Sequence, residues 1–174
     1  FEPKDKLTRP LKDLTKESIF NLIQHSNKFE INFLNSKILD LFSGVGSFGL
    51  EAISRGSRNV TFVENYSGVL DMLKKNISSI NAQNHCKIIE NDVFLSLENV
   101  NLNDAYDIIF LDPPYKEKKL LAIFDKIYSK KIIKKNGIII VHRHKKEKDE
   151  FPKNFNIIEE RVYGISKIIF GNYL

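Results

Sequence analysis

The sequence predicts an α/β fold in which helices cover both faces of a mostly parallel, twisted, seven-stranded sheet that ends in an antiparallel hairpin. Short apolar runs alternate with amphipathic stretches of helical period between residues 37 and 141. Two further β-rich segments meet at Tyr163-Gly164 near the C-terminus. Alternation of this kind favours parallel strands joined by helical crossovers. Ligands of such sheets bind beyond the carboxyl ends of the strands.

The elements follow in order along the chain. Residues 1–36 are expected to form an arm and a helix that ends near Gln24 and packs on the core, and residues 37–174 a single domain. Apolar runs predict parallel strands at 37–41, 59–63, 85–90, 106–111 and 137–141. Apolar positions at helical spacing predict helices at 47–55, 67–81 and 119–130. Alternating residues predict the closing hairpin at 156–162 and 166–171.

The composition is that of an ordinary globular domain. The chain has 174 residues, of which 42% are hydrophobic and 28% charged. No apolar run approaches the roughly 20 residues of a membrane span, so no membrane partner is expected. Cys86 is the only cysteine, which excludes intramolecular disulfides and cysteine-based metal clusters. A monomeric cytoplasmic protein without a metal is the simplest interpretation.

Positive charge is concentrated in one segment. The formal net charge is +5, and residues 116–153 contain 13 Lys and Arg against 5 Asp and Glu. A polyanionic partner near this segment is one interpretation. A solvated helix face in a lysine-rich chain is the other. His142 and His144 also lie in the segment, where a histidine more often binds backbone or phosphate than acts as a base.

A glycine-rich loop follows the first predicted strand. Gly44, Gly46 and Gly49 form a G-x-G-x-x-G pattern between strand and helix, which permits a tight turn and close approach of a nucleotide. A turn that needs small residues only for packing is the alternative. Glu64 ends the second strand 20 positions after Gly44, where an acid can bind both ribose hydroxyls.

Three features favour S-adenosylmethionine over a dinucleotide as the ligand. Asp40 precedes the first glycine by four residues, where dinucleotide-binding folds usually have an apolar residue. Asp92 follows the third strand, where it can meet an adenine amino group or, alternatively, cap a helix at 93–97. The third feature is a tetrapeptide after the fourth strand.

That tetrapeptide is Asp112-Pro113-Pro114-Tyr115. The two prolines end the buried strand and stiffen the turn that follows. An acid fixed beside free backbone carbonyls can accept two N–H bonds from an exocyclic amino group, and the tyrosine ring can stack on a base. The alternative without a functional role is a strand that ends at the prolines and an aspartate that faces solvent.

Together these residues resemble the Rossmann-like class I S-adenosylmethionine-dependent methyltransferases that act on amino groups. The resemblance implies that the cofactor-binding residues are Asp40, Phe42, Gly44, Gly46, Glu64, Asp92 and Asp112. It also implies that Asp112, Pro113, Pro114 and Tyr115 are catalytic. In that role Asp112 and the Pro113 carbonyl hold the amino group, and Tyr115 stacks on the base.

Segments in the N-terminal third of the chain make the resemblance more specific. Arg9-Pro10 and the segment 16–23, with the 40–52 and 62–64 blocks, are similar to the bacterial 16S ribosomal RNA guanine-N2 methyltransferases. That family implies methylation of a guanine in 16S RNA, presented as RNA, as the 30S subunit or as an assembly intermediate. The basic segment supplies the candidate RNA contacts Lys116, Lys118 and Lys119, for each of which a solvated loop is the alternative, and Arg143 as a candidate phosphate contact. Arg9 is a further candidate RNA contact. Leu11, Lys16 and residues 141–144 depart from the family pattern.

Four rivals remain. A DNA adenine-N6 methyltransferase shares the tetrapeptide, although 174 residues leave little room for a target-recognition domain. A small-molecule or protein amide methyltransferase does not account for the basic segment. A non-catalytic RNA-binding or assembly module would be expected to have a broken glycine loop or tetrapeptide, and both are intact here. A nicotinamide oxidoreductase would leave the tetrapeptide unexplained.

Overall fold

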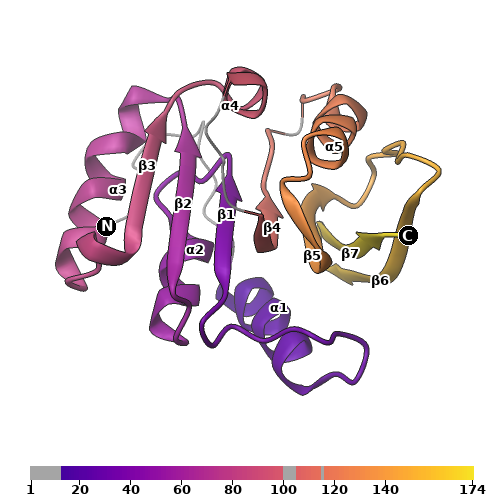
Figure 1. Ribbon diagram of the computed structural model, residues 1–174, viewed down its shortest axis with the longest axis horizontal. Coiled ribbons are helices and arrows are strands. Elements are labelled where there is room, and N and C mark those ends of the chain that lie inside the picture. Colours follow the sequence, from indigo (N-terminus) through magenta and orange to yellow (C-terminus); the bar gives the residue numbers. More distant parts are fainter. Residues whose placement is uncertain (1–12, 100–104, 115) are drawn as a thin grey trace.

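A computed structural model describes residues 13–99, 105–114 and 116–174 (Figure 1). Its strands form one sheet in the order β3-β2-β1-β4-β5-β7-β6, parallel except for β7, which runs antiparallel to β5 and β6. The strands are β1 (Lys37–Leu41), β2 (Asn59–Glu64), β3 (Cys86–Glu90), β4 (Tyr106–Leu111), β5 (Ile133–His144), β6 (Phe155–Tyr163) and β7 (Ser166–Tyr173). The helices are α1 (Asp13–His25), α2 (Ser47–Ser54), α3 (Ser67–Ser79), α4 (Val93–Asn99) and α5 (Leu120–Ser129), with a 3₁₀ turn at Gln83–His85. The predicted sheet, its parallel strands and its closing hairpin are confirmed.

Strand β5 differs most from its prediction. It was expected at 137–141 and extends from Ile133 to His144. The sequence signal ends at Val141 because the next residues are polar, yet β7 pairs with β5 as far as His144. An antiparallel neighbour therefore continues the backbone ladder through residues that carry no apolar pattern. The extension brings His142 and Arg143 into the sheet.

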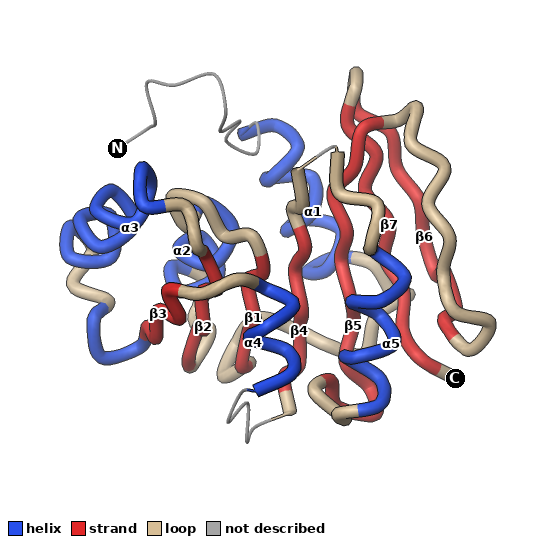
Figure 2. The backbone as a smooth tube through the Cα atoms, turned by 90° about the horizontal axis from the view of Figure 1, so that it is seen from above, coloured by secondary structure: helices blue, strands red, loops and turns tan. Residues whose placement is uncertain are grey.

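Two helical layers enclose the sheet. Seen from above, α1, α2 and α3 lie over one face and α4 and α5 over the other (Figure 2). On the first face the ring of Phe48 stacks on Phe110 at a centroid distance of 4.0 Å, and Phe20 of α1 packs against Phe48 at 5.0 Å. On the second face Phe124 of α5 is fully buried. Burial of each such ring contributes about 1.5–3 kcal/mol.

No helix within the described residues combines the length and the apolar character required to cross a bilayer.

Candidate active site

A row of polar side chains crosses five neighbouring strands at the carboxyl edge of the parallel sheet. Side chains alternate between faces along a strand, and Val63 of β2, Leu41 of β1, Leu111 of β4 and Val141 of β5 all pack in the core on the α4–α5 side. Glu64, Asp112 and His142 each follow one of these apolar residues, and they therefore face the α1–α3 side. Asp40, which precedes Leu41, faces the same side. This polar row consists of Glu64, Asp40, Asp112, His142 and, from the start of β7, Ser166.

Asp40 supports the start of helix α2. The N-cap residue of this helix is Gly46, which has no side chain to cap with. Asp40 Oδ2 instead accepts a hydrogen bond from the Gly49 amide at 3.0 Å. Burial raises the pKa of Asp40 well above its usual value, the Gly49 bond opposes this rise, and the charges of Asp112 and Glu64 add to it. Three carboxyl groups therefore share one small region of the sheet edge.

Glu64 ties the glycine loop to the end of β2. Its Oε2 accepts a hydrogen bond from the Gly44 amide at 2.7 Å. Its Oε1 accepts hydrogen bonds from the amides of Asn65 and Tyr66 at 2.9 and 2.8 Å. The acid that the sequence singled out for ribose binding thus also fixes the shape of the loop.

The three glycines of the loop serve different purposes. A Cβ on Gly49 would lie 2.4 Å from the Phe62 ring, and a Cβ on Gly46 would lie 2.5 Å from a Leu73 methyl group. Close packing of α2 on the sheet therefore requires Gly49, whereas Gly46 has a φ of +83°, a left-handed conformation that favours glycine. Gly44 has a φ of +54°, and its Cβ would meet nothing within 4 Å. Gly44 is thus the glycine that faces open space, where a ligand can approach the backbone.

Two neighbours of Gly44 are unusual. Phe42 adopts a φ of 58°, a left-handed conformation that is strained for a bulky residue. The hydroxyl of Ser43 is buried and has no hydrogen-bond partner within the described part of the chain. Unsatisfied buried polar groups and strained backbones are concentrated at functional sites. The loop therefore has the features of a binding site as well as of a tight turn.

Asp92 caps helix α4. Its Oδ1 accepts hydrogen bonds from the Phe94 and Leu95 amides at 2.8 and 3.2 Å. The structure thus shows the capping role that the sequence left open. The adenine contact expected from the resemblance stays a prediction.

Asp112 begins a turn that is held on several sides. Its amide donates to the Leu41 carbonyl at 3.3 Å, which fixes the turn against β1. Its Oδ1 lies 2.8 Å from His142 Nδ1. Over residues 13–99, 105–114 and 116–174, Asp112 Oδ2 makes no hydrogen bond. Pro113 is buried and Pro114 exposed, and the Glu117 amide closes the turn on the Pro114 carbonyl at 2.8 Å.

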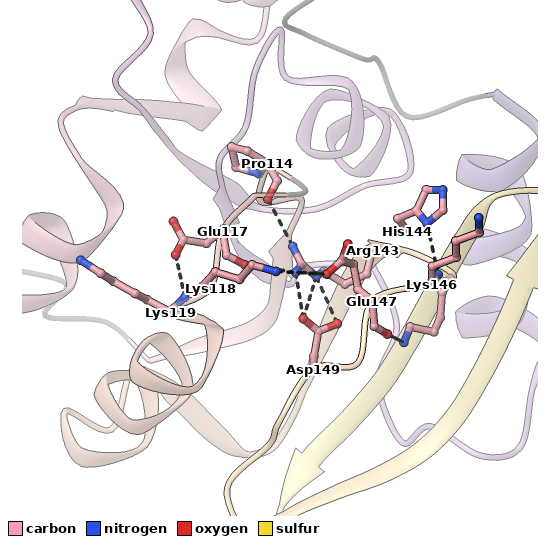
Figure 3. Close-up of polar contacts among 10 residues, drawn as sticks. Pro114, Glu117, Lys118, Lys119, Arg143, His144, Lys146, Glu147 and Asp149 are labelled. Atoms are coloured by element: carbon pink, nitrogen blue, oxygen red, sulfur yellow. Dashed lines mark hydrogen bonds and ion pairs between the residues drawn. The ribbon is translucent and has the colours of Figure 1, made fainter.

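Arg143 is buried beneath this turn, with 1% of its side chain exposed. Figure 3 shows its guanidinium between the turn and the loop that follows β5. Nη2 and Nε each lie 2.9 Å from Asp149 Oδ1, Nη1 donates to the Pro114 carbonyl at 3.3 Å and Nη2 to the Glu117 carbonyl at 3.1 Å. The phosphate contact predicted for Arg143 does not fit this placement, because the guanidinium is enclosed and occupied. Its observed role is to hold the turn.

The candidate lysines lie on the surface just beyond the turn. Lys116, Lys118 and Lys119 are exposed. Lys118 lies 3.8 Å from Glu147, and the ammonium of Lys119 lies 5.5 Å from the centre of the Phe94 ring. A polyanion at the carboxyl edge can reach all three. Arg9 and Tyr115, the remaining predicted site residues, lie outside the described residues.

Sequence reasoning gave little weight to His142 and none to Ser166. Both belong to the polar row, where His142 contacts Asp112 directly. Strands β4 and β5 are parallel with Leu111 opposite Val141, so Asp112 and His142, the next residues of the chain, are neighbours. Each is the first polar residue after an apolar run, which is visible in the sequence. Their contact could be predicted only if β4 and β5 were known to be adjacent in the sheet.

Comparison with known proteins places the chain in a family. Residues 2–172 match the family described as Conserved hypothetical protein 95. The chain is 34% identical over 154 residues to the protein named Ribosomal RNA small subunit methyltransferase D of Buchnera aphidicola subsp. Acyrthosiphon pisum, covering 88% of this chain and 76% of that protein. It is 30% identical over 159 residues to the Haemophilus influenzae protein of the same name, covering 90% and 79%.

A solved structure supports the fold. The Escherichia coli protein yhhF, which carries a provisional methyltransferase name, matches with a TM-score of 0.82 at 23% identity, covering 98% of this chain and 90% of that chain. The fold is that of the class I methyltransferases. The chain belongs to the Conserved hypothetical protein 95 family, the family of the small-subunit ribosomal RNA methyltransferases D.

Proposed function

We propose that this chain is a ribosomal RNA methyltransferase that transfers a methyl group from S-adenosylmethionine to the N2 amino group of a guanine in 16S RNA. The observation that carries the proposal is the polar row, which brings Asp112 and its proline turn beside the glycine loop. The relatives named for small-subunit RNA support the substrate class. The guanine N2 atom follows from the resemblance of the motifs.

The region around Gly44 suits a cationic nucleoside. S-adenosylmethionine supplies an activated methyl group on a positively charged sulfur. Glu64 supplies negative charge there, and its charge and that of Asp112 add to the rise in the pKa of Asp40. In the proposal Gly44 allows close approach, Phe42 and Gly46 shape the loop, Glu64 binds the ribose and Asp92 lies by the adenine.

Asp112 and Pro113 would orient the amino group. Asp112 Oδ2 is available as an acceptor, whereas the Pro114 carbonyl already binds Glu117 and Arg143. The Pro113 carbonyl is the second acceptor, as the resemblance implies. Two such bonds favour a pyramidal nitrogen with its lone pair directed at the methyl group, and alignment accounts for most of the catalysis. S-adenosylmethionine would supply the methyl group and leave as S-adenosylhomocysteine, and Asp112 Oδ2 would take the proton that the methylated amino group loses.

The RNA would lie across the carboxyl edge. Lys116, Lys118 and Lys119 would contact phosphates, which position the substrate without reading its sequence. The target guanine would leave its stack at a cost of a few kcal/mol. Arg9 and the stacking ring of Tyr115 remain parts of the proposal that rest on the resemblance alone.

The deciding experiment is methyl transfer from labelled S-adenosylmethionine to 30S subunits and 16S RNA from a strain lacking the enzyme. Nucleoside analysis identifies the labelled atom. Label recovered as N2-methylguanosine is the expected result, and Asp112→Ala should abolish it with little change in cofactor affinity. Duplex DNA is incubated in parallel. Label in DNA adenine, or cofactor binding without transfer to any of these substrates, would contradict the proposal.

A further inference from the structure

His142 lies between Asp112 and Ser166 and contacts both. Its Nδ1 is 2.8 Å from Asp112 Oδ1, and its Nε2 is 2.9 Å from Ser166 Oγ. The imidazole is buried, with 9% of its side chain exposed, and 22% of the Asp112 side chain is exposed. A contact of this length in a nearly closed site is specific, because few other groups can satisfy either ring nitrogen there.

The hydrogen-bond chemistry fixes the tautomer of the imidazole. An ionised carboxylate can only accept, so His142 Nδ1 must carry the proton that it shares with Asp112. In a neutral imidazole the other nitrogen then accepts, so the Ser166 hydroxyl donates to Nε2. Ser166 thus holds the ring in the orientation in which Nδ1 faces Asp112.

The consequence for Asp112 is that its two oxygens are no longer equivalent. Oδ1 is fixed by His142, and rotation of the carboxylate would break that bond. Oδ2 remains available as an acceptor, because it makes no hydrogen bond in the described part of the chain. A carboxylate held in this way needs no reorientation when an amino group arrives.

We propose that His142, oriented by Ser166, is a positioning residue that holds Asp112 so that Oδ2 accepts the N–H bond of the target amino group. The inference rests on the proposed function, because it assigns a purpose to the same aspartate. His142 does not touch the substrate in this arrangement. Its contribution is expected in turnover rather than in binding of either substrate.

A matched pair of variants tests the hydrogen bond. The amide nitrogen of asparagine occupies nearly the position of histidine Nδ1, so His142→Asn keeps a donor for Asp112. His142→Leu has a similar size and no donor. We expect kcat of the asparagine variant to remain within about threefold of wild type and kcat of the leucine variant to fall about 10- to 100-fold. KM and cofactor affinity should change little in both.

The control is His85→Leu, since His85 is exposed and lies at the amino end of β3, on the opposite edge of the sheet. Its kcat should equal that of wild type. Equal kcat for His142→Leu and wild type would overturn the inference. Equal losses for the asparagine and leucine variants would also overturn it, because they would indicate packing rather than the donated bond.

A second measurement does not depend on activity. The ¹⁵N NMR spectrum of the histidine side chains in the wild-type protein reports which ring nitrogen is protonated, and comparison with His142→Asn assigns the signal among the four histidines. We expect a proton on Nδ1, the nitrogen that faces Asp112. A proton on Nε2 alone would overturn the inference. If wild type fails to methylate 30S subunits, the proposed function fails while this spectrum still decides the pairing.

Discussion

Asp40 and Gly49 are joined by a 3.0 Å hydrogen bond from the Gly49 amide to Asp40 Oδ2, in a place where only 1% of Asp40 is exposed. The bond caps helix α2 from strand β1. It also keeps a carboxyl group buried beside two others, so that burial and the charges of Asp112 and Glu64 raise its pKa. The capping bond and the burial therefore act on stability in opposite directions.

The first prediction concerns Asp40→Asn and pH. The pKa of Asp40 is higher in the folded than in the unfolded state. The protonated carboxyl group therefore favours the folded state fully below the unfolded-state pKa of about 3.9, and the wild type loses this stability as the pH rises through the folded-state pKa. Asparagine does not titrate and its carbonyl can still accept from Gly49. The variant should therefore gain in Tm over wild type as the pH is raised from 4 to 8.

Thermal unfolding across this pH range measures the effect. A change of 1 kcal/mol in the free energy of unfolding shifts the Tm of a domain of this size by about 2–4 °C. Asp71→Asn, at an exposed position on α3, is the control. A constant difference in Tm between Asp40→Asn and wild type at all pH values would contradict the prediction.

The second prediction separates ligand binding from packing in the glycine loop. Gly44 and Gly164 both have positive φ, +54° and +61°, and a Cβ on either would meet nothing within 4 Å. Alanine should therefore cost a similar amount of stability at both, about 1–2 kcal/mol. Only Gly44→Ala should also weaken S-adenosylmethionine binding, by at least about tenfold, because only Gly44 belongs to the proposed site.

Calorimetric titration with the cofactor measures this difference. Gly49→Ala provides the contrast, because its Cβ would collide with the Phe62 ring at 2.4 Å and should lower the free energy of unfolding by about 1–3 kcal/mol. Equal cofactor affinity in Gly44→Ala and Gly164→Ala would show that Gly44 does not approach the ligand.

The third prediction concerns Arg143. Arg143→Met leaves Asp149 buried, with 6% of its side chain exposed, and without its partner. Removal of one member of a buried pair costs about 3–5 kcal/mol. The variant should unfold at a correspondingly lower denaturant concentration, and hydrogen exchange at the Glu117 amide should accelerate because the turn is no longer supported by the guanidinium.

The double variant Arg143→Met with Asp149→Asn should recover part of this stability, since it removes the uncompensated charge. Arg161→Met is the control, because Arg161 pairs with Glu159 at 2.7 Å but is half exposed, where such pairs contribute about 0–1 kcal/mol. A cost for Arg143→Met no larger than that for Arg161→Met would refute the tethering role.

Local patterns were sufficient to predict the sheet. The runs at Lys37–Leu41 and Tyr106–Leu111 are mainly apolar, and both strands were predicted at their observed bounds. The polar end of β5 could not be predicted in this way, because His142 and Arg143 are held in the sheet by β7, a partner distant in sequence. For the same reason Arg143 was predicted to contact a phosphate of the RNA rather than a buried partner within the chain. A charged side chain is expected to face solvent unless its buried partners are known, which here are Asp149 and the Pro114 and Glu117 carbonyls.

The last prediction tests the RNA-facing lysines. Replacing Lys116, Lys118 and Lys119 together by glutamine should weaken binding to 16S RNA. The slope of log affinity against log salt should fall by about 0.7–0.9 for each phosphate that the variant no longer neutralises.

The matched control replaces Lys87, Lys130 and Lys135, which are also exposed but do not lie at the carboxyl edge. Both triples remove the same net charge, so a general field effect would change both slopes alike. Binding titrations at several salt concentrations measure the slopes. Equal slopes in the two triples would refute a localised RNA contact, whereas a reduced slope confined to the first would place the phosphate backbone beside the Asp112 turn.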